Sequence, residues 1–191
     1  MSKRRTQILE AAVRVIARDG VRGLRIEKLA AAAGVSTALI YYHFHDRAGV
    51  LHAALEHINH RATNYTDHAL AHADARVRVE TMLLLELQDS DDVRETSIAW
   101  GELRASAVFH PDLREALRTT TDAWNADIAA LIGHAQDAGT ISTGIDAIAA
   151  AERLTALVEG LSQRWNSGSI SLDRARALLT DAISVELDHR R

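Results

Sequence analysis

Hydrophobic residues recur at helical spacing along almost the whole chain. Apolar positions at i, i+3, i+4 and i+7 line one face of an α-helix, so the pattern predicts about nine helices and an all-α fold. Residues 62–75 are the least regular stretch. The predicted helices cover residues 3–18, 25–33, 36–44, a segment that starts at 47, and residues 75–88, 92–109, 112–138, 145–166 and 171–188.

The last two predicted helices are apolar on more than one side. Each has a main stripe, which includes Ile148 in the first, and residues such as Leu157, Leu178 and Val185 widen these stripes. A helix with two apolar faces needs two packing partners. We therefore expect a homodimer that pairs residues 145–166 and 171–188 in a four-helix bundle; burial inside a monomer core is the alternative.

A short turn separates the second and third predicted helices. Gly34 follows an alanine run and can adopt the left-handed conformation that ends a helix, while Ser36 is a good N-cap for the next one. Two short helices joined by a three-residue turn form a helix-turn-helix unit, whose second helix enters the DNA major groove. The turn therefore predicts DNA binding.

Charge is distributed unevenly along the chain. The 191 residues carry a net charge of −4, yet residues 1–52 hold nine Lys/Arg and four Asp/Glu, and residues 53–191 hold 13 and 22. A basic module on an acidic body suits a phosphate-binding domain attached to a regulatory one, although chance asymmetry is the alternative. We expect a DNA-binding domain over residues 1–46 and a regulatory domain over 47–191.

The amino-acid composition excludes several classes of protein and of site. The chain is 47% hydrophobic and 25% charged and has no cysteine, so disulfides and thiolate metal sites are excluded. No apolar run reaches the 18 or so residues of a membrane span, and residues 1–5 do not lead into a signal-peptide core. We expect a soluble cytoplasmic protein without a membrane partner.

A set of residues within the first 55 or so positions forms a specific pattern: Arg5, Ile8-Leu9, Ala11-Ala12, Gly20, Gly23-Leu24, Leu29-Ala30, Ala33-Gly34-Val35-Ser36, Ile40-Tyr41-Tyr42-His43-Phe44 and Arg47. This pattern resembles the N-terminal part of the TetR family of transcriptional regulators. The resemblance implies a three-helix DNA-binding domain over residues 1–46, a helical ligand-binding and dimerisation domain over residues 47–191, a palindromic operator bound by a dimer, and release by a small-molecule effector. Repression is the family default, and no cofactor is expected.

Positions on the third helix suggest a role for each residue. Val35, Ile40 and Phe44 are expected to hold this helix against the first two, while Thr37, Ala38 and Leu39 point outward to base edges. By resemblance, Tyr41, Tyr42 and His43 contact the DNA backbone and Arg47 anchors a phosphate; we expect one tyrosine ring to be mostly packed. The candidate DNA-contacting residues are Arg5, Arg25, Ser36, Thr37, Ala38, Leu39, Tyr41, Tyr42, His43 and Arg47.

Two basic positions leave alternatives open. Arg25 stands where family members usually have a Thr or Ser that caps the second helix, and its guanidinium can itself reach a phosphate. Arg4 and Arg5 either grip the DNA backbone or belong to a disordered arm.

The body resembles the subgroup of choline-responsive repressors of the betaine pathway. The resemblance lies in residues 110–139, 157–161 and Trp165, and it implies a small molecule held among helices four to seven without naming the ligand. Glu102 and Arg104 are polar groups on an otherwise apolar helix. Apolar walls with a few polar groups suit a ligand pocket, and plain core packing is the alternative. The candidate ligand-binding residues are Trp100, Leu103, Phe109, Thr120, Trp124 and Ile128.

Histidines are concentrated in one segment. Seven of the ten lie between His43 and His72, and the pairs His57/His60 and His68/His72 have helical zinc-ligand spacing. A metal ion or pH is therefore the alternative effector, and a solvated face is the simpler interpretation; we assign no metal site.

Two other functional classes remain open. An all-helical enzyme is one, but the sequence has no phosphate-cradling glycine loop, no Gly-x-Ser-x-Gly elbow and no cysteine nucleophile. An architectural DNA-binding protein is the other, and the acidic body argues against it. We therefore predict a ligand-responsive transcriptional regulator and not an enzyme.

Overall fold

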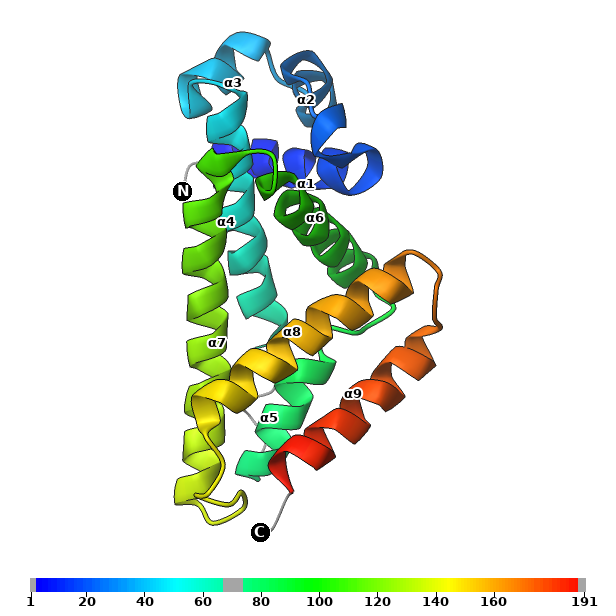
Figure 1. Ribbon diagram of the computed structural model, residues 1–191. Helices are drawn as coiled ribbons and strands as arrows, with labels where there is room; N and C mark the ends of the chain where they lie inside the picture. Colours follow the sequence, from blue (N-terminus) through cyan, green and yellow to red (C-terminus); the bar gives the residue numbers. More distant parts are fainter. Residues whose placement is uncertain (1–2, 67–73, 189–191) are drawn as a thin grey trace. The chain divides into compact units, whose positions relative to one another are not determined.

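A computed structural model describes residues 3–66 and 74–188, and within these ranges every regular element is a helix (Figure 1). The predicted all-α fold is confirmed. In this described part, no helix is long and apolar enough to cross a membrane. The elements are α1 (Lys3–Gly23), α2 (Ile26–Ala33), α3 (Thr37–Phe44), α4 (Arg47–Thr66), α5 (Ala75–Leu84), α6 (Asp91–Ala107), the 3-10 helix η2 (Pro111–Leu113), α7 (Arg114–Asp137), α8 (Ala147–Asn166) and α9 (Leu172–Leu187).

The described residues form two compact units. Unit 1 comprises those of Met1–Ala62 and Glu95–Thr120, and unit 2 comprises those of Thr63–Arg94 and Thr121–Arg191. Each unit has its own aliphatic core. The functional division at residue 46 is a different partition of the chain and stays a prediction.

The core of unit 1 uses the apolar faces predicted for its helices. Most of its fully buried side chains come from α1, α2, α3, α4 and α6, and Leu24 and Leu113 join them from the segment after α1 and from η2. Each large aliphatic side chain contributes roughly 1.5–3 kcal/mol by leaving water. These side chains include Ile8, Ile16, Leu29, Ile40, Leu55 and Leu103.

Helix α1 is longer than predicted. The helix was expected to end at Arg18, but it continues to Gly23 across a break at Gly20, where φ is 72° and ψ is 169°. One more helical turn follows because Val21 is buried in the core, with 1% of its surface exposed. The glycine interrupts the helix as expected, and packing of the next residues restores it.

Two other boundaries differ from the sequence prediction. Helix α5 stops at Leu84 instead of residue 88, and the Gln88 amide donates to the carbonyl of Leu85 in the turn that follows. The segment at 112 starts as the 3-10 turn η2 with Pro111 at its first position, and α7 begins only at Arg114. Proline suits the first turn because it has no N–H to leave unpaired.

In unit 2, α8 and α9 lie side by side and antiparallel, and α5 contacts both (Figure 1). Their inner faces include Leu154, Val158, Leu179 and Ile183, all 2% exposed or less. Ile148 was predicted to belong to this stripe, and that prediction is wrong: its side chain is 66% exposed. It lies in the first turn of α8, where alanines, such as Ala150, occupy the buried positions instead.

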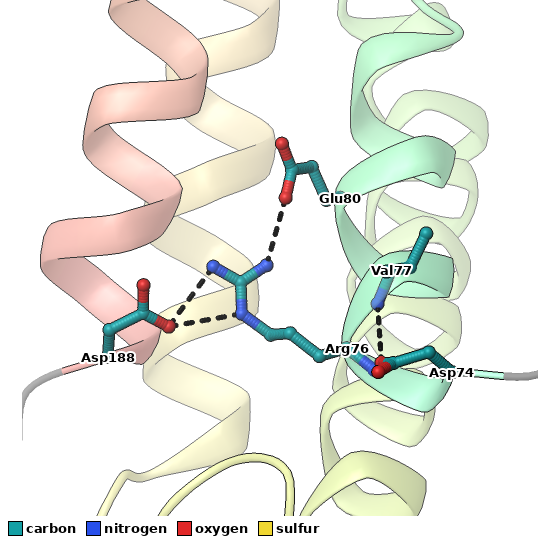
Figure 2. A network of polar contacts seen from close by, with 5 residues as sticks. All are labelled: Asp74, Arg76, Val77, Glu80 and Asp188. Atoms are coloured by element: carbon teal, nitrogen blue, oxygen red, sulfur yellow. Dashed lines mark hydrogen bonds and ion pairs between the residues drawn. The ribbon is translucent and has the colours of Figure 1, made fainter.

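Polar contacts join the ends of α5 and α9 (Figure 2). Asp74 caps α5 by accepting hydrogen bonds from the backbone N–H groups of Arg76 and Val77. The Arg76 guanidinium reaches Asp188 at 3.2 Å and Glu80 at 3.4 Å. Further along, Arg176 of α9 donates to the carbonyls of Leu84, the last residue of α5, and Leu87 in the turn that follows. A basic side chain suits these positions because the last carbonyls of a helix lack partners within it.

Candidate DNA interface and effector residues

The turn between α2 and α3 has the predicted helix-turn-helix geometry. Gly34 is left-handed, with φ 63° and ψ 38°, and the Val35 N–H donates to the carbonyl of Ala30 at 3.0 Å. The Ser36 hydroxyl accepts a hydrogen bond from the N–H of Leu39 at 3.2 Å, so Ser36 is the N-cap of α3. The caps expected from the sequence are confirmed.

The inner side of α3 is fastened as predicted. Ile40 and Phe44 are buried, with 0% and 4% exposed, and the half-buried Val35 packs on the same core. The Arg5 guanidinium lies over the Phe44 ring, 5.3 Å from its centroid. Arg4 and Arg5 both belong to α1. The described structure therefore has no separate arm at these two residues, and Arg5 packs beneath α3.

The outer side of α3 differs from the prediction at Leu39. Thr37 and Ala38 are exposed, but Leu39 is half-buried and packs against the core of unit 1. The expectation that Leu39 points outward is therefore wrong, because hydrophobic burial holds part of its side chain. Thr37 and Ala38 remain open at the start of the helix.

Neither tyrosine of α3 is mostly packed. Tyr41 is 48% exposed and Tyr42 is 77% exposed, so the expectation of one packed ring is wrong. The Tyr42 and His43 rings meet edge to face, with centroids 5.1 Å apart. Two phenolic groups and an imidazole are thus presented at the C-terminal half of the helix, where each can hydrogen-bond to an acceptor.

The two arginines at the helix starts have different surroundings. Arg25 is the exposed N-cap residue of α2, and its side chain makes no capping hydrogen bond, as its departure from Thr or Ser implies. Arg47 donates from Nε to the carbonyl of Leu24 at 2.8 Å and from Nη2 to the carbonyl of Val21. Arg47 therefore ties the start of α4 to the end of α1, and its contact with phosphate stays a prediction.

Sequence reasoning missed two side chains that brace this part of the molecule. The Gln7 amide donates to the carbonyl of Ala33 at 2.7 Å, at the end of α2. The Glu102 carboxylate accepts from the N–H of Val21 at 3.2 Å. A glutamate among the mostly apolar residues in the second half of α6 was the available signal for Glu102, whereas Gln7 had none, because nothing local marks a residue whose partner is 26 positions away.

The candidate effector residues do not gather in one unit. Trp100, Leu103, Phe109 and Thr120 belong to unit 1, whereas Trp124 and Ile128 belong to unit 2. Leu103 and Ile128 are fully buried, as pocket walls or core residues would be. Phe109 is 75% exposed because α6 ends at Ala107, so within unit 1 the predicted wall position of Phe109 is wrong.

Polar surroundings distinguish two of these candidates. The Arg104 guanidinium lies 5.3 Å from the centroid of the Trp100 ring, which places a cation on a tryptophan face. The Thr120 hydroxyl donates to the carbonyl of Ala116 at 2.7 Å, one turn earlier in α7. Both side chains therefore already make polar contacts within unit 1.

Two buried polar side chains of unit 1 have atoms that find no hydrogen-bond partner among the described residues. His57 of α4 is 7% exposed and neither ring nitrogen is bonded within this part of the chain, and Thr96 of α6 is 4% exposed with its hydroxyl likewise unbonded. Most buried polar atoms in proteins have a partner, so these two side chains stand out in unit 1. Burial, followed by the charge of Arg61, lowers the pKa of His57 below its ordinary value of 6.5. The nearby Arg61 is paired with Glu95 at 2.9 Å.

The histidine spacing does not produce a metal cluster in the described residues. His57 is buried and its i+3 neighbour His60 is exposed, so the two imidazoles occupy different environments. His68 and His72 lie outside the described residues. In residues 3–66 and 74–188 no three His, Cys, Asp or Glu side chains are grouped as a metal ion requires.

Family comparisons match both ends of the chain. Residues 8–54 match the family described as bacterial regulatory proteins of the tetR family, and residues 75–188 match the C-terminal domain of BetI-type transcriptional repressors. The transcriptional regulator BetI of Proteus mirabilis is 26% identical over 192 residues, which cover 98% of this chain and 93% of that protein.

Two solved structures are similar over nearly the full length. A protein assigned to the TetR family from Rhodococcus sp. is 49% identical, covers 98% of this chain and 100% of its own, and superposes with a TM-score of 0.92. A transcriptional regulator from Saccharomonospora viridis, solved in complex with choline, is 31% identical over 96% of each chain with a TM-score of 0.84.

Proposed function

This chain belongs to the TetR family of transcriptional regulators and has a BetI-type C-terminal domain, and on this premise we propose that it is a dimeric repressor released from its operator by a small molecule. The observation that carries the proposal is the capped turn at Gly34–Ser36, which presents the exposed Thr37 and Ala38 at the start of α3. Recognition helices meet base edges with their first residues. Family membership confirms the predicted regulator and excludes the enzyme interpretation.

The proposed contacts with DNA are of two kinds, those to base edges and those to phosphates. Thr37 hydrogen-bonds to a base edge and Ala38 packs on a thymine methyl group, while the partly exposed Leu39 and the adjacent Ser36 border this contact. Tyr41, Tyr42, His43 and the exposed Arg25 bind phosphates and position the helix. Arg5 and Arg47 are the further basic candidates for phosphate contact in this proposal.

The dimer forms through α8 and α9. Val185 is 63% exposed on α9, and Leu157 and Leu178 remain half-buried on α8 and α9. These apolar surfaces support an isologous four-helix interface between two copies. The dimer presents two recognition helices to half-sites that are one helical turn, or a multiple of it, apart on the operator. Operator binding places the protein in the cytoplasm.

The effector binds in the BetI-type body, and choline is the first ligand to test. Support comes from the choline-bound regulator of Saccharomonospora viridis, which is similar along nearly the whole chain. His57 and Thr96 offer unbonded polar atoms inside unit 1. Leu103, Trp100 and Thr120 of the same unit are the further candidates for contact with the effector, and the candidates Trp124 and Ile128 of unit 2 stay separate predictions. Release requires that the effector bind the DNA-free conformation more tightly than the bound one.

Selection of bound fragments from random double-stranded DNA tests the proposal directly. The expected product is an inverted repeat, bound by two copies of the chain, with an affinity that falls steeply with salt. Asymmetric or unrelated sequences contradict the palindromic operator. Titration of the complex with millimolar choline chloride, with tetramethylammonium and sodium chloride as controls, then tests release; DNA that stays bound in choline excludes choline as the effector.

A further inference from the structure

The turn at Gly20–Leu24, which ends α1, is held by side chains from two other helices. Glu102 of α6 accepts a hydrogen bond from the Val21 N–H at 3.2 Å. Arg47 of α4 donates to the Val21 carbonyl and, at 2.8 Å, to the carbonyl of Leu24. Both polar groups of residue 21 are therefore satisfied by side chains outside α1, one acidic and one basic.

Gly20 makes room for the Glu102 carboxylate. Its φ of 72° lies in the left-handed region that favours glycine, and a Cβ added there would be 2.8 Å from Glu102 Oε2. The break at Gly20 also leaves the Val21 N–H without a helical acceptor at the start of the following turn, while the Val21 side chain is 1% exposed. A buried N–H needs a partner, and a carboxylate supplies a charge-assisted one.

The two clamping residues, Glu102 of α6 and Arg47 of α4, lie outside the DNA-binding head. The head is defined here as residues 3–46. Glu102 shares α6 with Thr96 and Trp100, two residues considered above for effector contact. Thr96 and Glu102 are six positions apart, which is about 9 Å along a helix. Since a helix moves as a stiff rod over this distance, a displacement at Thr96 is passed on to the Glu102 carboxylate.

We propose that Glu102 is a positioning residue that couples α6 to the DNA-binding head through the Val21 peptide; the inference rests on the proposed repressor function. With the Glu102–Val21 bond made, the end of α1 is held between α6 and α4, and the head has one orientation. When α6 shifts, the carboxylate leaves Val21, and the end of α1 is then held by Arg47 and by the apolar core of unit 1. The two arrangements are the discrete states that an effector and an operator bias in opposite directions.

Hydrogen exchange at the Val21 amide tests the contact, and operator affinity tests the coupling. In the full-length protein, Glu102→Ala is expected to speed Val21 exchange about tenfold and to weaken binding to the selected operator about fivefold, because the head is less preorganised. Glu102→Gln, whose amide oxygen can still accept, is expected to lie between wild type and Glu102→Ala in both measurements. The matched control is Glu95→Gln, which changes another half-buried glutamate of α6, one paired with Arg61, and is expected to leave Val21 exchange unchanged.

A double-mutant cycle with Gly20→Ala tests the geometry. A methyl group at position 20 strains the backbone in any background but displaces the carboxylate only when Glu102 is present. Gly20→Ala is therefore expected to reduce operator affinity more in wild type than in Glu102→Ala.

Three results would overturn the inference: additive effects in the cycle, wild-type Val21 exchange in Glu102→Ala, or faster exchange with unchanged operator affinity. The last result would make Glu102 a purely structural residue. A wild-type protein that selects no operator contradicts the proposed function instead, and since Val21 exchange is measured without DNA, the two failures remain distinguishable.

Discussion

Two turns of unit 1 contain a left-handed glycine, yet they are stabilised in different ways. At Gly34–Ser36 the partners are Ala30, Ala31 and Leu39, all within five residues. At Gly20–Leu24 the Leu24 N–H donates to the Val21 carbonyl, but the side-chain partners are Arg47 and Glu102, and Glu102 lies 81 positions from Val21. The first turn shapes the recognition helix by itself, whereas the second depends on two other helices. The local turn is suited to keeping the recognition helix in one shape. The clamp formed by distant residues is suited to the regulation proposed above, because its contacts depend on how other helices pack.

The largest expected effect comes from removing the core beneath the local turn. Ile40 is fully buried, so Ile40→Ala is expected to lower the free energy of unfolding by about 2–5 kcal/mol through lost burial and a cavity. Denaturant unfolding followed by circular dichroism measures it. Ile148→Ala, at a position 66% exposed, is the control and should change stability by no more than about 0.5 kcal/mol. Equal losses in the two variants would contradict the assigned core.

The next largest effect on stability is expected at Arg47, which holds the turn at Gly20–Leu24, in comparison with the exposed Arg25. Arg47→Met removes two hydrogen bonds from a charged donor to backbone carbonyls, and we expect a loss of about 1.5–3 kcal/mol in the same unfolding experiment. Arg25→Ala removes an exposed arginine and should leave stability nearly unchanged. It should instead weaken operator binding and reduce the salt slope by about one. A stable Arg47→Met protein would show that the clamp contributes little.

Loss of the local cap is expected to have a smaller effect. Ser36→Ala removes the acceptor for the Leu39 N–H and should cost about 1 kcal/mol, while Ser36→Asp restores a capping oxygen. Thermal unfolding of the three proteins measures the difference. Hydrogen exchange at Val21 should not change in Ser36→Ala, because the two turns have separate partners. Faster exchange at Val21 in that variant would mean that the turns are coupled.

The smallest expected effect is a pH dependence of the free energy of unfolding. It arises from the buried His57 in the core of unit 1 and from neither turn. Burial and Arg61 lower the folded-state pKa of His57; His60 and Arg5 act in the same direction, and Glu10 opposes them. Because the unfolded chain binds a proton near pH 6.5, this stability is complete above that pH and is lost as pH falls from 6.5 toward the lower folded-state pKa.

A histidine replacement checks this dependence. His57→Leu should flatten the decline in unfolding free energy between pH 7 and pH 5, whereas His60→Leu, at an exposed position, should leave it unchanged. The measurement is denaturant unfolding at a series of pH values. An identical decline in wild type and His57→Leu would assign the dependence to other groups.

Predictions from the sequence were most accurate where the deciding interactions are local. The caps at Gly34 and Ser36 and the buried face of α3 followed from residue type and spacing. Leu39 and the two tyrosines were misplaced, because spacing gives the direction of a side chain and not the neighbours that cover it. Phe109 was misplaced for a similar reason: the end of α6 at Ala107 leaves it in an exposed turn.

The sequence by itself determined the helices, the helix-turn-helix turn and the family resemblance, because periodicity, caps and turn glycines act over a few residues. Only the tertiary structure decided that Arg47 braces α1, that His57 is buried with no hydrogen-bond partner in the described part of the chain, and that Glu102 accepts the Val21 N–H. These facts depend on which helices pack together. Such packing is the collective result of many weak apolar contacts, and no single residue or spacing records it.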